Sequence, residues 1–240
     1  MYKGIQVYKG TTLADKIAIS PAQVRRKIEY MMGRGEHLTI DGASIILAEL
    51  CGVLLGLRRS EHFASAESKP NRTTLLCFRN LAGASWDLGD LSKQVDISKW
   101  AADFTLDEVF KVRLCYTKHQ RHRVAHEVVA GPGYRLMSFV RWIKVLIRLR
   151  LMHNESLTVD SPLLVRENKG KIIPMSGASM SRMNKCFSPL LKWVKATIYS
   201  RRRGFATAAG RSGLHTYGNH YDCYEAFSRS NITVCIVIDR

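Results

Sequence analysis

The chain has 240 residues, of which 46% are hydrophobic, so it can bury the core of one or two domains. Lysine and arginine number 37 against 20 aspartates and glutamates, a net charge of +17. The abundance of apolar residues argues against intrinsic disorder, and no apolar run reaches the roughly 18 residues of a membrane span. Residues 1–4 lack an apolar signal segment, so we expect an intracellular protein. The charge favours a polyanionic partner, with nucleic acid the leading candidate.

The six cysteines are spread along the chain, and none of them forms a CxxC pair. This spacing argues against a zinc site and against a thioredoxin-type motif. Most of the cysteines lie among apolar residues, which is typical of reduced, buried thiols. We therefore expect neither a metal nor a cofactor.

Two helices are predicted in the first quarter of the chain, after a polar linker arm at residues 1–20. Ser20-Pro21 is a helix start, with Ser as the cap and Pro in the first position, and Gly33 or Gly35 ends this helix. The second helix begins near Asp41. Its apolar residues surround most of the helix (Ile45, Ile46, Leu47, Leu50, Cys51, Leu54 and Leu55). This pattern predicts a central, buried helix that ends at Gly56.

Strands are predicted in the middle of the chain. Residues 73–78 form a strand-like run, and residues 110–116 alternate between apolar and polar side chains. With residues 123–129, the second run predicts a β-hairpin whose tip is residues 118–122.

The second half of the chain predicts mostly helices. Residues 134–153 form an amphipathic helix whose basic side chains are either solvated or in contact with phosphate (Arg135, Arg141, Lys144, Arg148 and Arg150). A short strand at 161–165, a turn at 168–171 and helices at 176–194 and 199–213 follow, and Pro189 kinks or splits the helix at 176–194. Residues 232–238 are an apolar, β-branched run. The chain as a whole predicts an α+β fold, mainly helical, with a small antiparallel sheet or hairpin.

A first cluster of candidate functional residues follows the predicted buried helix. Arg58 comes directly after Gly56-Leu57, and Glu61 lies three residues further on. A carboxylate at this spacing can hold a guanidinium in one orientation. The alternative is an exposed turn closed by a salt bridge.

Two more basic clusters follow. Lys118, at the predicted hairpin tip, can reach into a groove and donate a proton to a leaving oxygen, or it is an ordinary solvated lysine. Arg201, Arg202 and Arg203 open a predicted helix, where positive charges oppose the helix dipole and repel one another. A phosphate bound between them would remove that conflict.

In this order the three clusters resemble the catalytic domain of the tyrosine recombinases, the phage integrase family. The family's first box, an apolar helix ending in Gly-Leu-Arg-x-Ser-Glu, is matched by Gly56 to Glu61, and its hairpin lysine by Lys118. Its second box, His-x-x-Arg-Arg-Gly-x-Ala-Thr, is matched by Tyr199 to Thr207 except at the first residue. The resemblance covers roughly residues 4–213. It implies a linker at 1–20, a catalytic domain of the DNA breaking-rejoining type at 21–213 and a divergent tail at 214–240.

The resemblance implies site-specific DNA recombination or integration without a metal or nucleotide. A tyrosine hydroxyl attacks a phosphodiester, two arginines hold the phosphate oxygens, and a lysine protonates the leaving oxygen. Carried over, Arg58 and Arg202 are the clamp, Lys118 is the acid and Glu61 supports Arg58. Further residues are expected to contact phosphate or support the site (Arg59, Arg123, Ser200, Arg201 and Arg203). The implied partners are DNA and other recombinase protomers, not a membrane, in the nucleus of a eukaryote or the cytoplasm and nucleoid of a bacterium.

The chain departs from the family pattern at two places. Tyr199 stands where the second-box histidine is expected, and a phenol with a pKa near ~10 is a poor proton shuttle. The nucleophilic tyrosine is expected within residues 231–234, which contain none, so Tyr224 is the best remaining candidate. We interpret the chain after Leu214 as divergent, truncated or altered in reading frame.

Four hypotheses therefore stay open. The first is a recombinase, active or formerly active, and the second is a DNA-binding remnant of a mobile-element integrase without catalysis. The third is a basic helical domain that binds RNA or an acidic partner, and the fourth is a topoisomerase with the same arginine, lysine and tyrosine chemistry.

Overall fold

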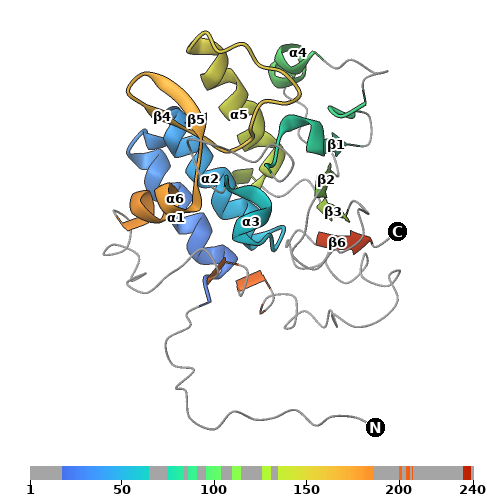
Figure 1. The fold of residues 1–240 in the computed structure, drawn as a ribbon. Helices are drawn as coiled ribbons and strands as arrows, with labels where there is room; N and C mark the ends of the chain where they lie inside the picture. Colours follow the sequence, from blue (N-terminus) through green and yellow to red (C-terminus); the bar gives the residue numbers. More distant parts are fainter. Residues whose placement is uncertain are drawn as a thin grey trace, which may run out of the picture.

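The structure is a computed structural model that describes most of the first 185 residues and a few short segments beyond them. The described residues are 18–64, 75–83, 86–90, 96–103, 110–114, 126–130, 135–185, 200–201, 204–205, 207 and 235–238. They form a mixed α+β fold, mostly helical, with two small antiparallel sheets (Figure 1). The predicted fold class is confirmed at this level. Within the described ranges, no helix is long and apolar enough to cross a membrane.

The helices are α1 (Pro21–Gly33), α2 (Ile40–Val53), α3 (Arg59–His62), α4 (Ile97–Ala102), α5 (Phe139–Met152) and α6 (Gly177–Lys185), with 3-10 turns η2 (Glu36–Leu38), η3 (Phe78–Asn80) and η5 (Arg135–Met137). The strands are β1 (Leu81–Gly83), β2 (Phe110–Leu114), β3 (His126–Ala130), β4 (Val165–Asn168), β5 (Lys171–Pro174) and β6 (Cys235–Ile238).

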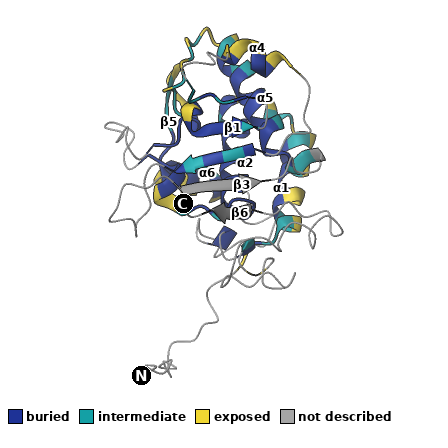
Figure 2. Ribbon diagram, turned by 90° about the vertical axis from the view of Figure 1, so that its right-hand side faces the viewer, coloured by how far each residue is buried: buried dark blue, intermediate teal, exposed yellow. Residues whose placement is uncertain are grey.

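Helices α1 and α2 confirm the predictions made for the first quarter of the chain. The Ser20 hydroxyl accepts a hydrogen bond from the Gln23 amide, and Pro21 occupies the first position of α1. Every residue of α2 except Asp41 is buried, as its apolar circumference predicted. Helices α1 and α5 and strand β4 pack against it, so α2 is the centre of the core (Figure 2).

The larger sheet has the strand order β1-β2-β3-β6. In β2 the apolar side chains Phe110, Val112 and Leu114 are buried, and the alternate residues are half-exposed, as the period-2 pattern predicted. Strand β2 pairs with β3 from Phe110↔Ala130 to Leu114↔His126, so the arms of the predicted hairpin are confirmed. The predicted tip, with Lys118, lies outside the described residues.

Strand β6 comes from the predicted tail. It pairs antiparallel with β3, with Val237 opposite Val128, and so forms one edge of the larger sheet. The apolar run at 232–238 therefore includes a strand of the main sheet.

Two predicted strands are wrong where the structure describes them. Over 75–78, Cys77 makes only an isolated bridge to Pro162, and the chain turns into η3 because the Asn80 side chain accepts the Cys77 amide at 2.7 Å. The predicted strand at 161–165 begins instead at Val165 and continues to Asn168. Its register is set by a two-residue turn, in which Lys169 and Gly170 have φ of 51° and 74°.

Three basic side chains of α5 have partners within the fold: Lys144, Arg148 and Arg150. Lys144 donates to the Asp103 carbonyl at 2.9 Å, and Arg148 donates to the Ala101 carbonyl at 2.8 Å. Cations at these carbonyls satisfy the C-terminal end of α4. For these two residues, neither predicted alternative, solvation or phosphate contact, describes the observed contacts.

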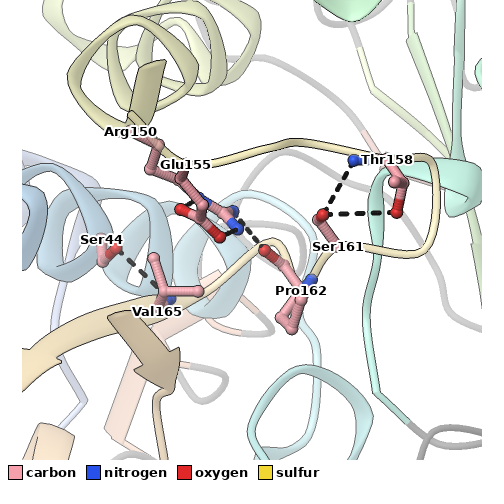
Figure 3. A network of polar contacts seen from close by, with 7 residues as sticks. All are labelled: Ser44, Arg150, Glu155, Thr158, Ser161, Pro162 and Val165. Carbon is pink, nitrogen blue, oxygen red and sulfur yellow. Dashed lines mark hydrogen bonds and ion pairs between the residues drawn. The ribbon is translucent and has the colours of Figure 1, made fainter. Parts of the chain in front are cut away.

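Arg150, also on α5, is fully buried and holds the following loop (Figure 3). Its guanidinium donates to both oxygens of Glu155, at 2.7 and 2.6 Å, and to the Pro162 carbonyl at 2.6 Å. This bidentate pair ties the end of α5 to the segment that leads into β4.

Candidate functional site

The first box forms a sharp corner at the end of α2. The Leu57 amide donates to the Cys51 carbonyl at 3.1 Å, and Gly56 has a φ of 62°, a conformation that glycine adopts at little cost. Arg58 follows in extended conformation and caps α3. The corner therefore presents Arg58 immediately beyond the buried helix.

Glu61 holds Arg58 at two points. One carboxylate oxygen accepts the Arg58 amide at 2.6 Å, and the other accepts its Nη1 at 2.9 Å. The Glu61 side chain is 5% exposed and that of Arg58 26%. The contact expected from the spacing is present, and it fixes a guanidinium that still reaches solvent.

His62 lies beneath this corner and was not singled out in the sequence. Its Nδ1 is 2.7 Å from the Arg58 carbonyl, and the residue is 1% exposed. Burial lowers the pKa of His62 to about 4, so the ring is neutral at physiological pH and its Nδ1–H can donate to that carbonyl. Its Nε2 has no hydrogen-bond partner among the described residues.

Of the second box, the structure describes Ser200, Arg201, Gly204, Phe205 and Thr207, all in helical conformation. Ser200 is buried, and its carbonyl accepts the Ile19 amide at 2.9 Å. Arg201 is 3% exposed and donates from Nε and Nη2 to Glu49 at 2.5 and 2.7 Å. The buried carboxylate of Glu49 thus balances the charge of Arg201 within the fold.

The two boxes, far apart in the sequence, are in contact. A Cβ added to Gly52 would come within 2.6 Å of the Arg201 Cβ, and one added to Gly56 would come within 2.7 Å of the Phe205 ring. Both distances are shorter than real side chains tolerate. The second-box segment therefore packs directly on the glycines of the last turn of α2 and of the corner after it.

Arg59 extends the first box towards α6. Its guanidinium lies against Gly177 at the start of that helix. The chain just after α3 is also hydrogen-bonded to the chain just before α6, because the Ala64 amide donates to the Met175 carbonyl at 3.1 Å. The first box is thus held by α6 as well as by the second box.

The structure brings five predicted site residues into one region, and the other six lie outside the described residues. Those described are Arg58, Arg59, Glu61, Ser200 and Arg201; those outside are Lys118, Arg123, Tyr199, Arg202, Arg203 and Tyr224. In the described part of the chain, no group of three His, Cys, Asp or Glu side chains is placed to hold a metal ion.

Sequence reasoning also missed Glu49 and Lys27. Glu49 accepts Lys27 Nζ at 2.7 Å in addition to Arg201, and both Lys27 and Glu49 are 0% exposed. A signal was present, because Glu49 is the one charged residue in the apolar run from Ile45 to Leu55. A charge inside a fully buried helix requires a buried partner.

The fold and the site together define a mixed α+β protein with a fixed, partly exposed arginine at the end of its central helix. Comparison of the chain with known protein families, with curated proteins and with solved structures finds no match.

Proposed function

We propose that this chain is a DNA strand transferase of the tyrosine-recombinase type. The observation that supports the proposal is the contact between the two arginine-bearing boxes, through Gly52 with Arg201 and Gly56 with Phe205. The ion pair of Arg58 with Glu61, three positions further on, also supports the proposal, because the guanidinium that Glu61 holds is still open to a ligand.

In the proposed reaction a tyrosine hydroxyl loses its proton to water, its oxygen attacks the scissile phosphorus and the bond to the 5′-oxygen breaks. The tyrosine becomes joined to the 3′-phosphate, and Lys118 gives its proton to the departing 5′-oxygen. Arg58 and Arg202 hold the nonbridging oxygens, whose charge grows in the transition state. Attack by a second 5′-hydroxyl on the phosphotyrosine restores the phosphodiester and frees the tyrosine. Tyr224 is the candidate nucleophile, and Tyr199 supplies a hydrogen bond where the family uses a histidine.

DNA and further protomers on that DNA are the proposed partners. The net charge of +17 supplies affinity for any duplex by releasing condensed counterions, so binding weakens steeply with salt. Arg58 and Arg202 contribute little to this affinity for DNA, because many other lysines and arginines remain.

A second candidate is a DNA-binding remnant that no longer cleaves. The absence of a tyrosine from 231–234 and the phenol at position 199 favour it. Both candidates bind DNA through the positive charge of the chain and differ only in covalent chemistry.

The test is a pool of nicked duplexes with a randomised core, in which a cleaved strand diffuses away and traps the covalent adduct. We expect an adduct with the unmodified chain, a loss of at least about 100-fold in Arg58→Ala and a modest change in DNA affinity. Arg34→Ala is the matched control, because Arg34 is an exposed arginine that pairs with Glu36 away from the boxes. It should retain the adduct.

The outcomes separate the candidates. DNA binding without any adduct supports the remnant, and loss of the adduct in Tyr224→Phe identifies the nucleophile. A chain that binds no DNA at low salt contradicts both.

A further inference from the structure

A cluster of buried charges joins three helices and the second box beneath the proposed site. Lys27 on α1 and Arg201 both donate to Glu49 on α2, and Lys27 also donates to the Asn184 side chain on α6. The Arg201 pair is bidentate, with Nε on one carboxylate oxygen and Nη2 on the other. Both oxygens of Glu49 are therefore engaged, and neither reaches solvent.

All three groups are ionised at neutral pH, so the cluster holds two positive charges and one negative charge. Burial by itself would raise the pKa of Glu49, but Arg201 and Lys27 lower it to about 2. Burial lowers the pKa of Lys27 to about 8 against the attraction of Glu49. Apolar side chains of similar volume commonly fill such a space at least as stably. The bidentate pair of Glu49 and Arg201 does fix the orientation of the Arg201 guanidinium, which apolar packing would not do.

The orientation of Arg201 affects how the second box lies against the first. Glu49 holds Arg201, the chain neighbour of the clamp residue Arg202, and Gly52 of the same helix contacts the Arg201 side chain. On the other side, His62 bonds the Arg58 carbonyl and lies within the electrostatic influence of both Arg201 and Glu49. The cluster thus contacts the second box at Arg201 and acts electrostatically on His62, which bonds the main chain of Arg58.

We propose that Glu49 is a positioning residue for the DNA-cleaving site: it sets the second box against the first by holding Arg201. This inference rests on the proposed function, and it assigns to Glu49 no contact with DNA. Transfer of a phosphoryl group is sensitive to misplacement of the groups that hold it, and an error of 1 Å can cost about 100-fold in rate.

The first variant is Glu49→Gln, which keeps the shape of the side chain and removes its charge. We expect the cleavage rate at saturating DNA to fall at least about 100-fold, with DNA affinity changed less than about twofold, because the residue is buried away from phosphate. The matched control is Glu155→Gln, which makes the same chemical change in the Arg150 pair, whose contacts are with Glu155 and Pro162 (Figure 3). It should leave the cleavage rate unchanged at a temperature where both variants are folded.

Glu49→Gln removes the negative charge that two buried cations share and can fail to fold, so a second variant is needed. Lys27→Met, Glu49→Leu and Arg201→Met together replace the cluster by apolar side chains of similar length. A folded triple variant that binds DNA but has lost cleavage supports the proposal. A folded triple variant that cleaves at the unmodified rate overturns it, and so does failure of both variants to fold, which would assign the cluster to folding alone.

A second measurement does not depend on cleavage. Hydrogen exchange at the Ile19 amide, which donates to the Ser200 carbonyl, reports whether the second box stays in place. Faster exchange there in Glu49→Gln, and not in Glu155→Gln, supports the positioning role even if the unmodified chain forms no covalent adduct and the proposed function fails. Equal exchange in the two variants overturns the role.

Discussion

The contact between the corner after α2 and the second box can be tested with one methyl group. Gly56 has a φ of 62°, and a Cβ at this position would lie 2.7 Å from the Phe205 ring. Gly56→Ala therefore adds two costs, a left-handed backbone for a residue with a Cβ and an overlap with an aromatic ring. The first costs about 1–2 kcal/mol and the second about 1–3 kcal/mol.

The chain contains a matched control for the backbone cost. Gly170, in the turn between β4 and β5, has a φ of 74°, and a Cβ there would meet nothing within 4 Å. Gly170→Ala thus carries only the cost of about 1–2 kcal/mol. The difference between the two variants measures how tightly the second box packs on the corner.

The assay is unfolding in urea, with the free energy of unfolding extrapolated to water. We expect Gly56→Ala to lose about 2–5 kcal/mol in all, which is at least 1 kcal/mol more than Gly170→Ala. Phe205→Leu added to Gly56→Ala should recover part of the difference, because a double-mutant cycle detects residues in contact. Equal losses for the two glycine variants, or no recovery, would refute the packing of the second box on this corner.

Two further predictions concern the buried His62 and the basic residues of α5. Because the pKa of His62 is lowered from 6.5 to about 4, the unfolded chain binds the proton more readily, so the stability due to His62 is complete above pH 6.5 and falls as the pH drops towards 4. His62→Phe should remove about 3 kcal/mol from the difference in unfolding free energy between neutral pH and pH 4, and an unchanged pH profile would contradict the assignment. Arg148→Met should cost about 1–3 kcal/mol of stability, because the Ala101 carbonyl loses its donor, and should not change the dependence of DNA affinity on salt. A salt slope reduced by about one would show instead that Arg148 contacts phosphate.

The structural elements that were predicted correctly depend on interactions between residues near one another in the chain. Helix α1 starts where Ser20 caps it, and the capping partner Gln23 is three residues away. The Arg58–Glu61 pair also spans three residues, so its spacing was enough to predict it. The alternation in β2 predicted both the strand and its buried face.

The predicted elements that were wrong also have local causes, which the patterns did not reveal. The amide that would have continued a strand at Cys77 is taken by the Asn80 side chain. In the second case, the turn at Lys169-Gly170 sets where β4 pairs with β5, so the strand runs from Val165 to Asn168. Propensity favoured a strand in both places, but hydrogen bonds of individual side chains and turns decided its limits.

The candidate site was predictable only in part. The motifs and their order indicated which arginines to consider. They did not indicate that the Arg201 side chain is buried, because nothing in a run of three arginines distinguishes a buried side chain from an exposed one. Its partner Glu49 lies far away in the sequence and was visible there only as a lone charge in an apolar run.

By itself, then, the sequence determined the charge, the central buried helix, the hairpin arms and the local fixation of Arg58, since each depends on composition, on periodicity or on residues a few positions apart. Only the tertiary structure decided that the two boxes touch, that Lys27, Glu49 and Arg201 share one buried cluster, and that Lys144 and Arg148 close the end of α4. The physical reason is that a pattern identifies which side chains must be buried or paired, whereas the choice of partner depends on which distant segments the fold brings together.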